Sequence, residues 1–285
     1  MERVGVVGCG LMGSGIAEVC ARAGLEVNVV EAHDGALAAG QARIEKSLNR
    51  AVTAGKLDET EHQHVLGRLG FHTDIGSLAD RELVVEAIVE AEEPKTELFT
   101  ALDAIVEAPD AVLASNTSSI PIMKLAMATK QPDRVVGIHF FNPVPVMRLV
   151  EVVPSLLTSE ETEAAATAFA DEVLSKRVVR SQDRAGFVVN ALLIPYLLSA
   201  VRMYESGFAS AEDIDAGMVL GCGHPMGPLA LTDLIGLDTT NAVADSLYEE
   251  FREQLYAPPP LLSRMVEAGL LGRKSGRGFF EYPPR

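Results

Sequence analysis

Short apolar runs alternate with longer, helix-like segments through the first half of the chain. The apolar runs cover residues 4–7, 27–30, 83–86, 112–115 and 135–140, and the clearest helical patterns between them lie at 12–23 and from 34 to about 54. Strands that are buried on both faces give runs as short and as apolar as these. The alternation therefore predicts an α/β domain whose mostly parallel sheet is covered by helices on both faces.

The strand pattern ends after about residue 179, and helical patterns fill the rest of the chain. A long apolar helix is expected at 186–207, and further helices around 212–220, 227–235, 239–253 and 260–268. A length of 285 residues suits two domains of ordinary size. We therefore expect an α/β domain at 1–182 and an all-helical second domain at 183–285.

Composition and charge narrow the class of protein. Hydrophobic residues make up 48% of the chain, which is enough for a packed core, and the net charge of −16 argues against a general binder of nucleic acids or membrane surfaces. No apolar run reaches the ~20 residues that span a bilayer, and the N-terminus lacks a secretory pattern. Three scattered cysteines (Cys9, Cys20 and Cys222) give neither a disulfide framework nor a zinc spacing. We expect a cytoplasmic protein without a metal site.

A glycine-rich turn joins the first predicted strand to the first predicted helix. It fits the pattern G-x-G-x-x-G, with the residues Gly8, Cys9, Gly10, Leu11, Met12 and Gly13. The first glycine permits a tight turn, the second lets a pyrophosphate approach the backbone, and the third packs the helix closely on the strand. Unpaired N–H groups at the helix N-terminus suit the phosphates. This context predicts a doubly wound sheet of the Rossmann type that binds a dinucleotide.

An acidic residue follows the second predicted strand at the distance that this motif requires. Glu31 is placed to accept both ribose hydroxyls of a dinucleotide, and its charge would repel a 2′-phosphate. The pattern therefore favours NAD over NADP. Two other interpretations stay open here: a glycine loop that only packs a helix, and a Glu31 that is merely a surface acid.

Polar residues at two further strand ends suggest the chemistry. Oxidation of an alcohol requires a base for the hydroxyl proton, and a histidine held by a carboxylate suits that task. His139 with Glu90 could supply this pair, and Ser118 could hydrogen-bond the substrate oxygen. From the pattern alone, His139 could equally be a core histidine whose hydrogen bonds are satisfied, and the residues around Ser118 could be turn and cap residues.

Several separate stretches resemble the L-3-hydroxyacyl-CoA dehydrogenase family, and within it the bacterial single-function 3-hydroxybutyryl-CoA dehydrogenases. The stretches are Ala-Ser-Asn-Thr-Ser-Ser at 114–119, His-Phe-Phe-Asn-Pro at 139–143, Gly-Phe-Val-Val-Asn at 186–190, His-Pro-Met-Gly-Pro at 224–228 and the glycine- and lysine-containing tail at 272–280. The resemblance covers essentially the whole chain and follows the same order. It implies an NAD-dependent oxidoreductase that transfers a hydride between NAD(H) and C3 of a short-chain (S)-3-hydroxyacyl-CoA or 3-oxoacyl-CoA.

The resemblance also implies a role for individual residues. His139 would be the general base, Glu90 its orienting partner and Ser118 a ligand of the substrate oxygen, and Asn190 would reach the reacting group. Lys95, Asn142 and Lys274 would lie near the cofactor. Related enzymes pair through the helical domain, so a homodimer is expected.

The sequence departs from its relatives at two positions of interest. Cys9 occupies a position in the glycine loop that is more often alanine, and a thiol there could make the site sensitive to oxidation. Ala191 follows Asn190 where many relatives carry arginine, so this position lacks the charge that would anchor the substrate there.

A local basic patch offers a place for the phosphates of CoA. Arg43, Lys46 and Arg50 recur three and four residues apart on one helix face, and Lys56 follows just beyond. Charge-assisted hydrogen bonds from this patch could hold CoA, although the same pattern fits a solvated helix face. Two other functions remain as alternatives: dehydrogenation of a free hydroxy acid or sugar acid, and cofactor binding without turnover.

Overall fold

The computed structural model describes residues 1–283 of the chain. The chain divides into two compact units, Met1–Arg184 and Ala185–Arg285. The sequence placed this division slightly earlier, between residues 182 and 183.

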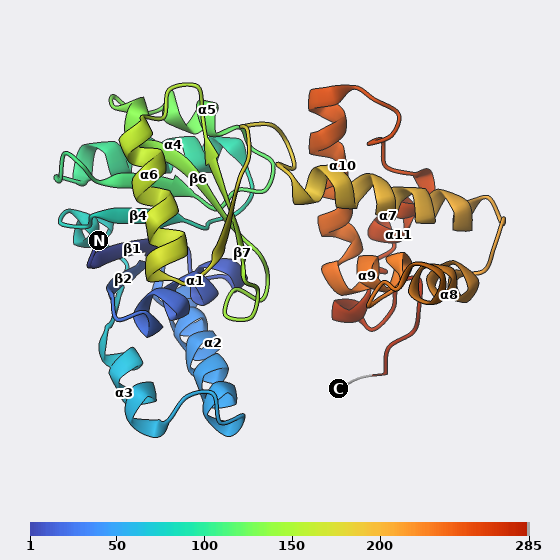
Figure 1. Ribbon diagram of the computed structural model, residues 1–285, viewed down its shortest axis with the longest axis horizontal. Coiled ribbons are helices and arrows are strands. Elements are labelled where there is room, and N and C mark those ends of the chain that lie inside the picture. Colours follow the sequence, from blue (N-terminus) through green and yellow to red (C-terminus); the bar gives the residue numbers. More distant parts are fainter. Residues whose placement is uncertain (284–285) are drawn as a thin grey trace. The chain divides into compact units, whose positions relative to one another are not determined.

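One sheet organises the N-terminal unit (Figure 1). Its strands are β1 (Arg3–Val7), β2 (Glu26–Val30), β3 (Leu69–His72), β4 (Leu83–Glu86), β5 (Val112–Ser115), β6 (Val135–Phe140), β7 (Leu149–Pro154) and β8 (Arg177–Arg180). They lie in the order β3-β2-β1-β4-β5-β6-β7-β8. The strands from β3 to β6 in this order are all parallel, and their sequence 3-2-1-4-5-6 is the Rossmann arrangement. The predicted doubly wound, mostly parallel sheet is therefore confirmed.

Two strands extend this sheet beyond what the sequence pattern predicted. β7 pairs with β6 in the antiparallel sense, and β8 pairs with β7 in the parallel sense. β3 was also absent from the prediction, because Leu69-Gly70-Phe71-His72 has neither a long apolar run nor a clear alternation. β7 matters most for the site, because it brings Glu151 opposite His139 in the register of the two strands.

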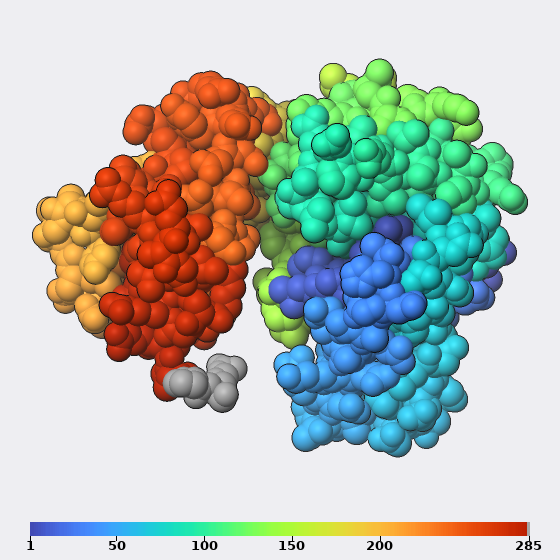
Figure 2. Space-filling model, turned by 180° about the vertical axis from the view of Figure 1, so that it is seen from behind, coloured from blue at the N-terminus to red at the C-terminus, as the bar shows by residue number. Residues whose placement is uncertain are grey.

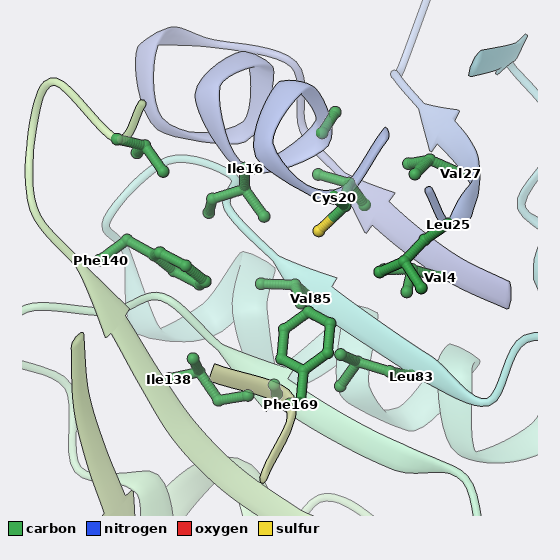
Figure 3. Close-up of a cluster of buried hydrophobic side chains, with 14 of the residues drawn as sticks. Val4, Ile16, Cys20, Leu25, Val27, Leu83, Val85, Ile138, Phe140 and Phe169 are labelled. Atoms are coloured by element: carbon green, nitrogen blue, oxygen red, sulfur yellow. The ribbon is translucent and has the colours of Figure 1, made fainter. Parts of the chain in front are cut away.

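Helices cover both faces of the sheet. They are α1 (Leu11–Arg22), α2 (Asp34–Thr53), α3 (Glu59–Gly67), α4 (Glu92–Ile105), α5 (Ile122–Ala126) and α6 (Glu160–Ala168), with short 3-10 or π turns at Ile75–Leu78, Pro132–Arg134 and Phe169–Val173. Side chains of α1, α2, α3 and α6 share one buried cluster with β1, β2, β4 and β6. Figure 3 shows Ile16 and Cys20 of α1 over this face, with Phe140 and Phe169 beside them. α5 packs on the other face, where Ile122 meets Gly137 of β6.

The second unit is helical and has its own core. Its helices are α7 (Val189–Glu205), α8 (Ala211–Cys222), α9 (Pro228–Ile235), α10 (Leu237–Phe251) and α11 (Pro260–Glu267), with a 3-10 turn at Arg273–Ser275. Among its described residues only isolated β-bridges occur, Gly272 with Arg277 and Arg277 with Glu281. The predicted all-helical region is thus confirmed. Within residues 1–283, no helix has the length and apolar character needed to cross a membrane.

Candidate active site

The glycine turn has the geometry that dinucleotide binding requires. Gly8 has a φ of 91°, and an added Cβ there would lie 2.6 Å from the carbonyl oxygen of Ala87. An added Cβ at Gly13 would lie 1.8 Å from the carbonyl oxygen of Gly8, so this glycine lets α1 sit directly on the turn. A Cβ at Gly10, in contrast, would meet no atom within 4 Å. The space over Gly10 at the start of α1 suits a pyrophosphate, as the sequence predicted.

The side chains that follow Gly10 differ in exposure. Leu11 is 65% exposed. Met12 is partly buried and packs against the hydrophobic core between the sheet and its helices. An exposed leucine at the first helical position offers apolar contact to a ligand on the turn. The predicted cofactor contacts of Leu11 and Met12 remain predictions.

Glu31 lies at the glycine turn, as its position after β2 predicted. Its Oε1 accepts a hydrogen bond of 2.6 Å from the backbone N–H of Cys9, and its Oε2 accepts one of 3.2 Å from Ala32. The carboxylate is only partly buried. It is therefore fixed beside the turn at the place where a Rossmann sheet receives the ribose of the dinucleotide.

Cys9 is not the reactive thiol that the sequence suggested. Its side chain is fully buried, and α2 crosses it so closely that an added Cβ at Gly40 would lie 2.4 Å from Sγ. Burial, and then the charge of Glu31, raise the pKa of Cys9 to about 12 despite the opposing effect of Arg43. A thiol that is buried and protonated resists oxidation, so the expected sensitivity is a wrong prediction.

Three side chains form a hydrogen-bonded chain at the ends of β5, β6 and β7. Nδ1 of His139 lies 2.7 Å from Oε2 of Glu151, and Nε2 lies 3.2 Å from Oγ of Ser118. His139 and Glu151 oppose each other directly in the antiparallel pair of β6 and β7, so their side chains share one face. His139 is 4% exposed and Glu151 is fully buried. The imidazole is therefore held at one nitrogen by a carboxylate and reaches a hydroxyl with the other.

The predicted pairing of His139 with Glu90 is wrong. Oε1 of Glu90 instead accepts hydrogen bonds from the hydroxyl of Thr117 at 2.6 Å and from the backbone of Ser118 at 2.8 Å, and Ser119 bonds the same oxygen. Partial desolvation raises the pKa of Glu90, but Lys95 and the hydrogen bonds from Thr117 and Ser118 outweigh it, so this pKa lies below its usual value. Glu90 thus stays ionised and fixes the turn that carries the Ser118 hydroxyl.

A buried ionic network lies behind this turn. Nζ of Lys95 is 2.5 Å from Oε1 of Glu86 and 3.2 Å from Oε2 of Glu90. Oε2 of the fully buried Glu86 accepts a bond of 2.6 Å from the hydroxyl of Ser115, which ties β4 to β5. Lys95 itself is 1% exposed, so its buried ammonium is neutralised by the two carboxylates with which it forms ion pairs. Its predicted contact with the cofactor remains a prediction.

Two further polar groups order the segments around His139. Oδ1 of Asn116 accepts a bond of 2.9 Å from the backbone N–H of Phe140, next to the histidine. Lys176 is buried, and its Nζ donates bonds of 2.6 Å to the carbonyl oxygens of Val144 and Met147 in the loop after β6. That loop begins at the exposed Asn142, which precedes a cis proline. The sequence had given Asn116 only a cap role, and it had missed Lys176.

The four basic residues near α2 do not share one environment. Nη1 of Arg43 donates a bond of 3.1 Å to the carbonyl oxygen of Cys9, so this side chain lies on the glycine turn. Lys46 and Arg50 are exposed on the helix surface. Lys56 lines a hollow of about 410 Å³ together with Arg22, His64 and Arg68. The predicted patch therefore separates into a residue at the turn and a more open basic surface.

The remaining predicted residues belong to the second unit. Asn190 lies in the first turn of α7 and is partly exposed. Lys274 makes an ion pair of 2.5 Å with Oδ1 of Asp238. The structure tests neither predicted role. Within residues 1–283, no group of three or more His, Cys, Asp or Glu side chains is arranged to hold a metal ion.

These features define a class of protein. A histidine that is backed by a carboxylate and that faces a hydroxyl can remove or return the proton of a substrate alcohol. The glycine turn and Glu31 on the same sheet edge provide for a dinucleotide that accepts or donates the hydride. The fold and the site are those of a nicotinamide-dependent dehydrogenase.

Comparison with known proteins identifies the family. Residues 3–184 match the model of the 3-hydroxyacyl-CoA dehydrogenase NAD binding domain, and residues 186–282 match that of the C-terminal domain of the same family. The chain belongs to the 3-hydroxyacyl-CoA dehydrogenase family, which confirms the resemblance seen in the sequence.

The similarity to individual members of this family extends over almost the whole length of both chains. The chain is 62% identical to a 3-hydroxybutyryl-CoA dehydrogenase of Mycobacterium tuberculosis (strain H37Rv), over 99% of both chains. The crystal structure of M. tuberculosis FadB2 matches with a TM-score of 0.98, at 62% identity and over 99% of both chains. The crystal structure of the (S)-3-hydroxybutyryl-CoA dehydrogenase PaaH1 from Ralstonia eutropha matches with a TM-score of 0.94, at 45% identity and over 100% of both chains.

The substitution Glu151→Gln tests the pairing of the histidine. We expect kcat to fall by about 10²-fold or more, because a neutral amide cannot stabilise the imidazolium that forms during proton transfer. Glu90→Gln is the matched control, and it should lower kcat less because Glu90 bonds the turn of Ser118, while Nδ1 of the imidazole bonds Glu151. Steady-state kinetics with acetoacetyl-CoA and NADH, together with the melting temperature of each variant, would decide. A larger loss of kcat in Glu90→Gln than in Glu151→Gln would instead support the pairing of His139 with Glu90 that the sequence predicted.

Proposed function

We propose that this protein catalyses the reversible NAD-dependent oxidation of a short-chain (S)-3-hydroxyacyl-CoA to the 3-oxoacyl-CoA, with 3-hydroxybutyryl-CoA and acetoacetyl-CoA as the preferred pair. The observation that carries the proposal is the hydrogen-bonded series Ser118–His139–Glu151, which lies in the same unit as the glycine turn. The names of the relatives, 3-hydroxybutyryl-CoA dehydrogenases at 62% and 43% identity, support the substrate.

Proton transfer falls to His139 in this mechanism. In the direction of oxidation, Nε2 of His139 takes the proton from the 3-hydroxyl group. The glycine turn and Glu31 would hold NAD⁺, which would supply the acceptor for the hydride of C3. Glu151 fixes the ring through Nδ1 and stabilises the imidazolium that forms. Ser118 holds the same substrate oxygen next to Nε2, and Glu90 fixes the turn that bears Ser118. In reduction, the imidazolium returns the proton to the developing alkoxide.

The remaining site residues take supporting roles in the proposal. Asn190 hydrogen-bonds the reacting group of the substrate, Asn142 and Lys95 approach the nicotinamide and its ribose, and Lys274 lies near the cofactor. For Lys95 the support is its ion pair with Glu90, beside the turn of Ser118. For the others the support is their place in the matched family motifs.

Removal of the imidazole tests the proposed function directly. We expect His139→Ala to lower kcat for reduction of acetoacetyl-CoA by about 10²- to 10⁴-fold, because the positioned acid–base group is lost. The affinity for NADH should remain, since His139 is no part of the glycine turn. The assay follows NADH absorbance with acetoacetyl-CoA, longer 3-oxoacyl-CoAs and free acetoacetate as substrates. An unchanged kcat would refute the role of His139, and faster turnover of the free acid would favour the hydroxy-acid alternative.

We also propose that Lys46, Arg50 and Lys56 bind the phosphates of CoA. Lys46 and Arg50 lie one helical turn apart on α2, and all three side chains are exposed. In a chain with a net charge of −16, residues 41–56 concentrate positive charge, because Glu45 is the single acid in that range. Several adjacent cations suit a ligand with several phosphate charges.

Shortened substrates can test this phosphate contact. Arg50→Ala and Lys56→Ala should each raise KM for acetoacetyl-CoA by about three- to tenfold, because each removes one charge-assisted contact with a phosphate. KM for acetoacetyl-pantetheine, which lacks these phosphates, should change little. The effect should also shrink as ionic strength increases. Equal effects on both substrates would rule out the contact.

We propose that the protein is a cytoplasmic homodimer that pairs through the second unit. Large apolar side chains on and next to α7 and α8 face solvent, with Leu192 72%, Phe208 79% and Leu220 85% exposed. Apolar groups exposed to this degree support an interface with a second copy. Light scattering should give twice the 30.4 kDa of one chain, and Leu220→Asp should lower that mass. A monomer in the unmodified protein would contradict the proposal.

A further inference from the structure

Two oppositely charged side chains bond the two backbone groups of one residue, Cys9, in the glycine turn. Oε1 of Glu31 accepts a bond of 2.6 Å from the N–H of Cys9, and Nη1 of Arg43 donates a bond of 3.1 Å to the carbonyl oxygen of Cys9. Glu31 reaches the turn from the end of β2 and Arg43 reaches it from α2. Cys9, between Gly8 and Gly10, is thus held at its N–H by one side chain and at its carbonyl oxygen by the other.

Close packing fixes Arg43 at this place. α2 crosses the turn at Gly40, where an added Cβ would lie 2.4 Å from Sγ of Cys9 and 2.8 Å from its carbonyl oxygen. Arg43 lies nearly one helical turn further along, so its guanidinium can reach back to the same carbonyl. In Figure 2 the deep blue start of the chain reaches the surface beside the lighter blue of α2. The Arg43 side chain is itself exposed, so its other N–H groups remain accessible to a ligand.

We propose that Glu31 and Arg43 together set the cofactor preference. The Glu31 carboxylate excludes a 2′-phosphate, and Arg43 is a latent phosphate ligand that binds this group once the carboxylate is removed. The adenosine ribose lies beside the acid that follows β2 in a Rossmann sheet. Here that acid bonds the N–H of Cys9, and Arg43 bonds the carbonyl oxygen of the same residue. Arginine remains charged and binds phosphate through paired N–H groups.

The charge balance explains why the preference depends on one residue. With Glu31 present, a 2′-phosphate would meet a carboxylate fixed by two backbone hydrogen bonds, which cannot turn away without losing them. Without Glu31, the charged group beside the backbone of Cys9 is the Arg43 guanidinium, which bonds its carbonyl oxygen. The preference should then shift toward NADPH through a residue that is already in place.

The test compares NADPH and NADH binding in the full-length protein. Binding is followed by the fluorescence of the reduced nicotinamide. Compared with the unmodified protein, Glu31→Ser should raise the affinity for NADPH relative to NADH by about 100-fold. Adding Arg43→Gln to Glu31→Ser should then weaken NADPH binding by about tenfold, with NADH affinity within about threefold. Higher ionic strength should reduce the difference that Arg43 makes.

A second double variant controls for the loss of charge. Lys130 is exposed and follows α5, which packs on the face of the sheet opposite α2, so Glu31→Ser with Lys130→Gln removes one positive charge away from the turn. This variant should bind NADPH as Glu31→Ser does. Equal NADPH affinity in Glu31→Ser with and without Arg43→Gln would overturn the proposal, as would no gain in Glu31→Ser. The melting temperature of each variant, compared with that of the unmodified protein, checks that it is folded.

This inference rests on the dinucleotide part of the proposed function, and the two can fail separately. If the unmodified protein binds NADH but does not turn over any acyl-CoA, the proposed reaction fails. The binding titrations would still decide the roles of Glu31 and Arg43, because they need no substrate.

Discussion

The hydrogen bond between His139 and Glu151 is the interaction on which the chemistry of this protein depends. It exists because β7 turns back along β6, which places a carboxylate directly across from the histidine. A charged carboxylate that is fully buried is costly unless it is paired and hydrogen-bonded, so the pair is held together by the protein interior itself. Each partner thereby fixes the other, and Nε2 is left to act on a substrate.

The other site residues extend from this pair along one edge of the sheet. Ser118 meets Nε2 of His139, and Glu90 fixes the turn of Ser118. Lys95 joins Glu90 to the buried Glu86, which is bonded in turn to Ser115 at the end of β5. The strands β4, β5, β6 and β7 are therefore linked near the site through polar side chains as well as through the backbone. Such a connected network can keep donors and acceptors in place before a ligand arrives.

The sequence predicted the parts of this arrangement that depend on local pattern. The glycine turn, Glu31 and the parallel strands β1, β2, β4, β5 and β6 each have a signature within a few residues, and the structure has all of them in the expected places. The partner of His139 was missed because it depends on how strands pair over a distance. Glu151 is a single acid within the apolar run 149–154, which is an unusual place for a carboxylate unless it has a buried partner. Recognition of β7 as an antiparallel neighbour of β6 would have exposed this signal.

A strongly acidic chain can hold anionic ligands because each phosphate meets local rather than total charge. At physiological ionic strength, screening limits the reach of a surface charge to about 8 Å. Most of the acids behind the net charge of −16 therefore have little effect on a ligand at the glycine turn. The N-terminus of α1, Arg43 on the Cys9 carbonyl and Glu31 on the Cys9 N–H act there at contact distance. The charged group nearest to a bound phosphate then decides which anionic ligand is preferred. A single carboxylate is enough to set this preference.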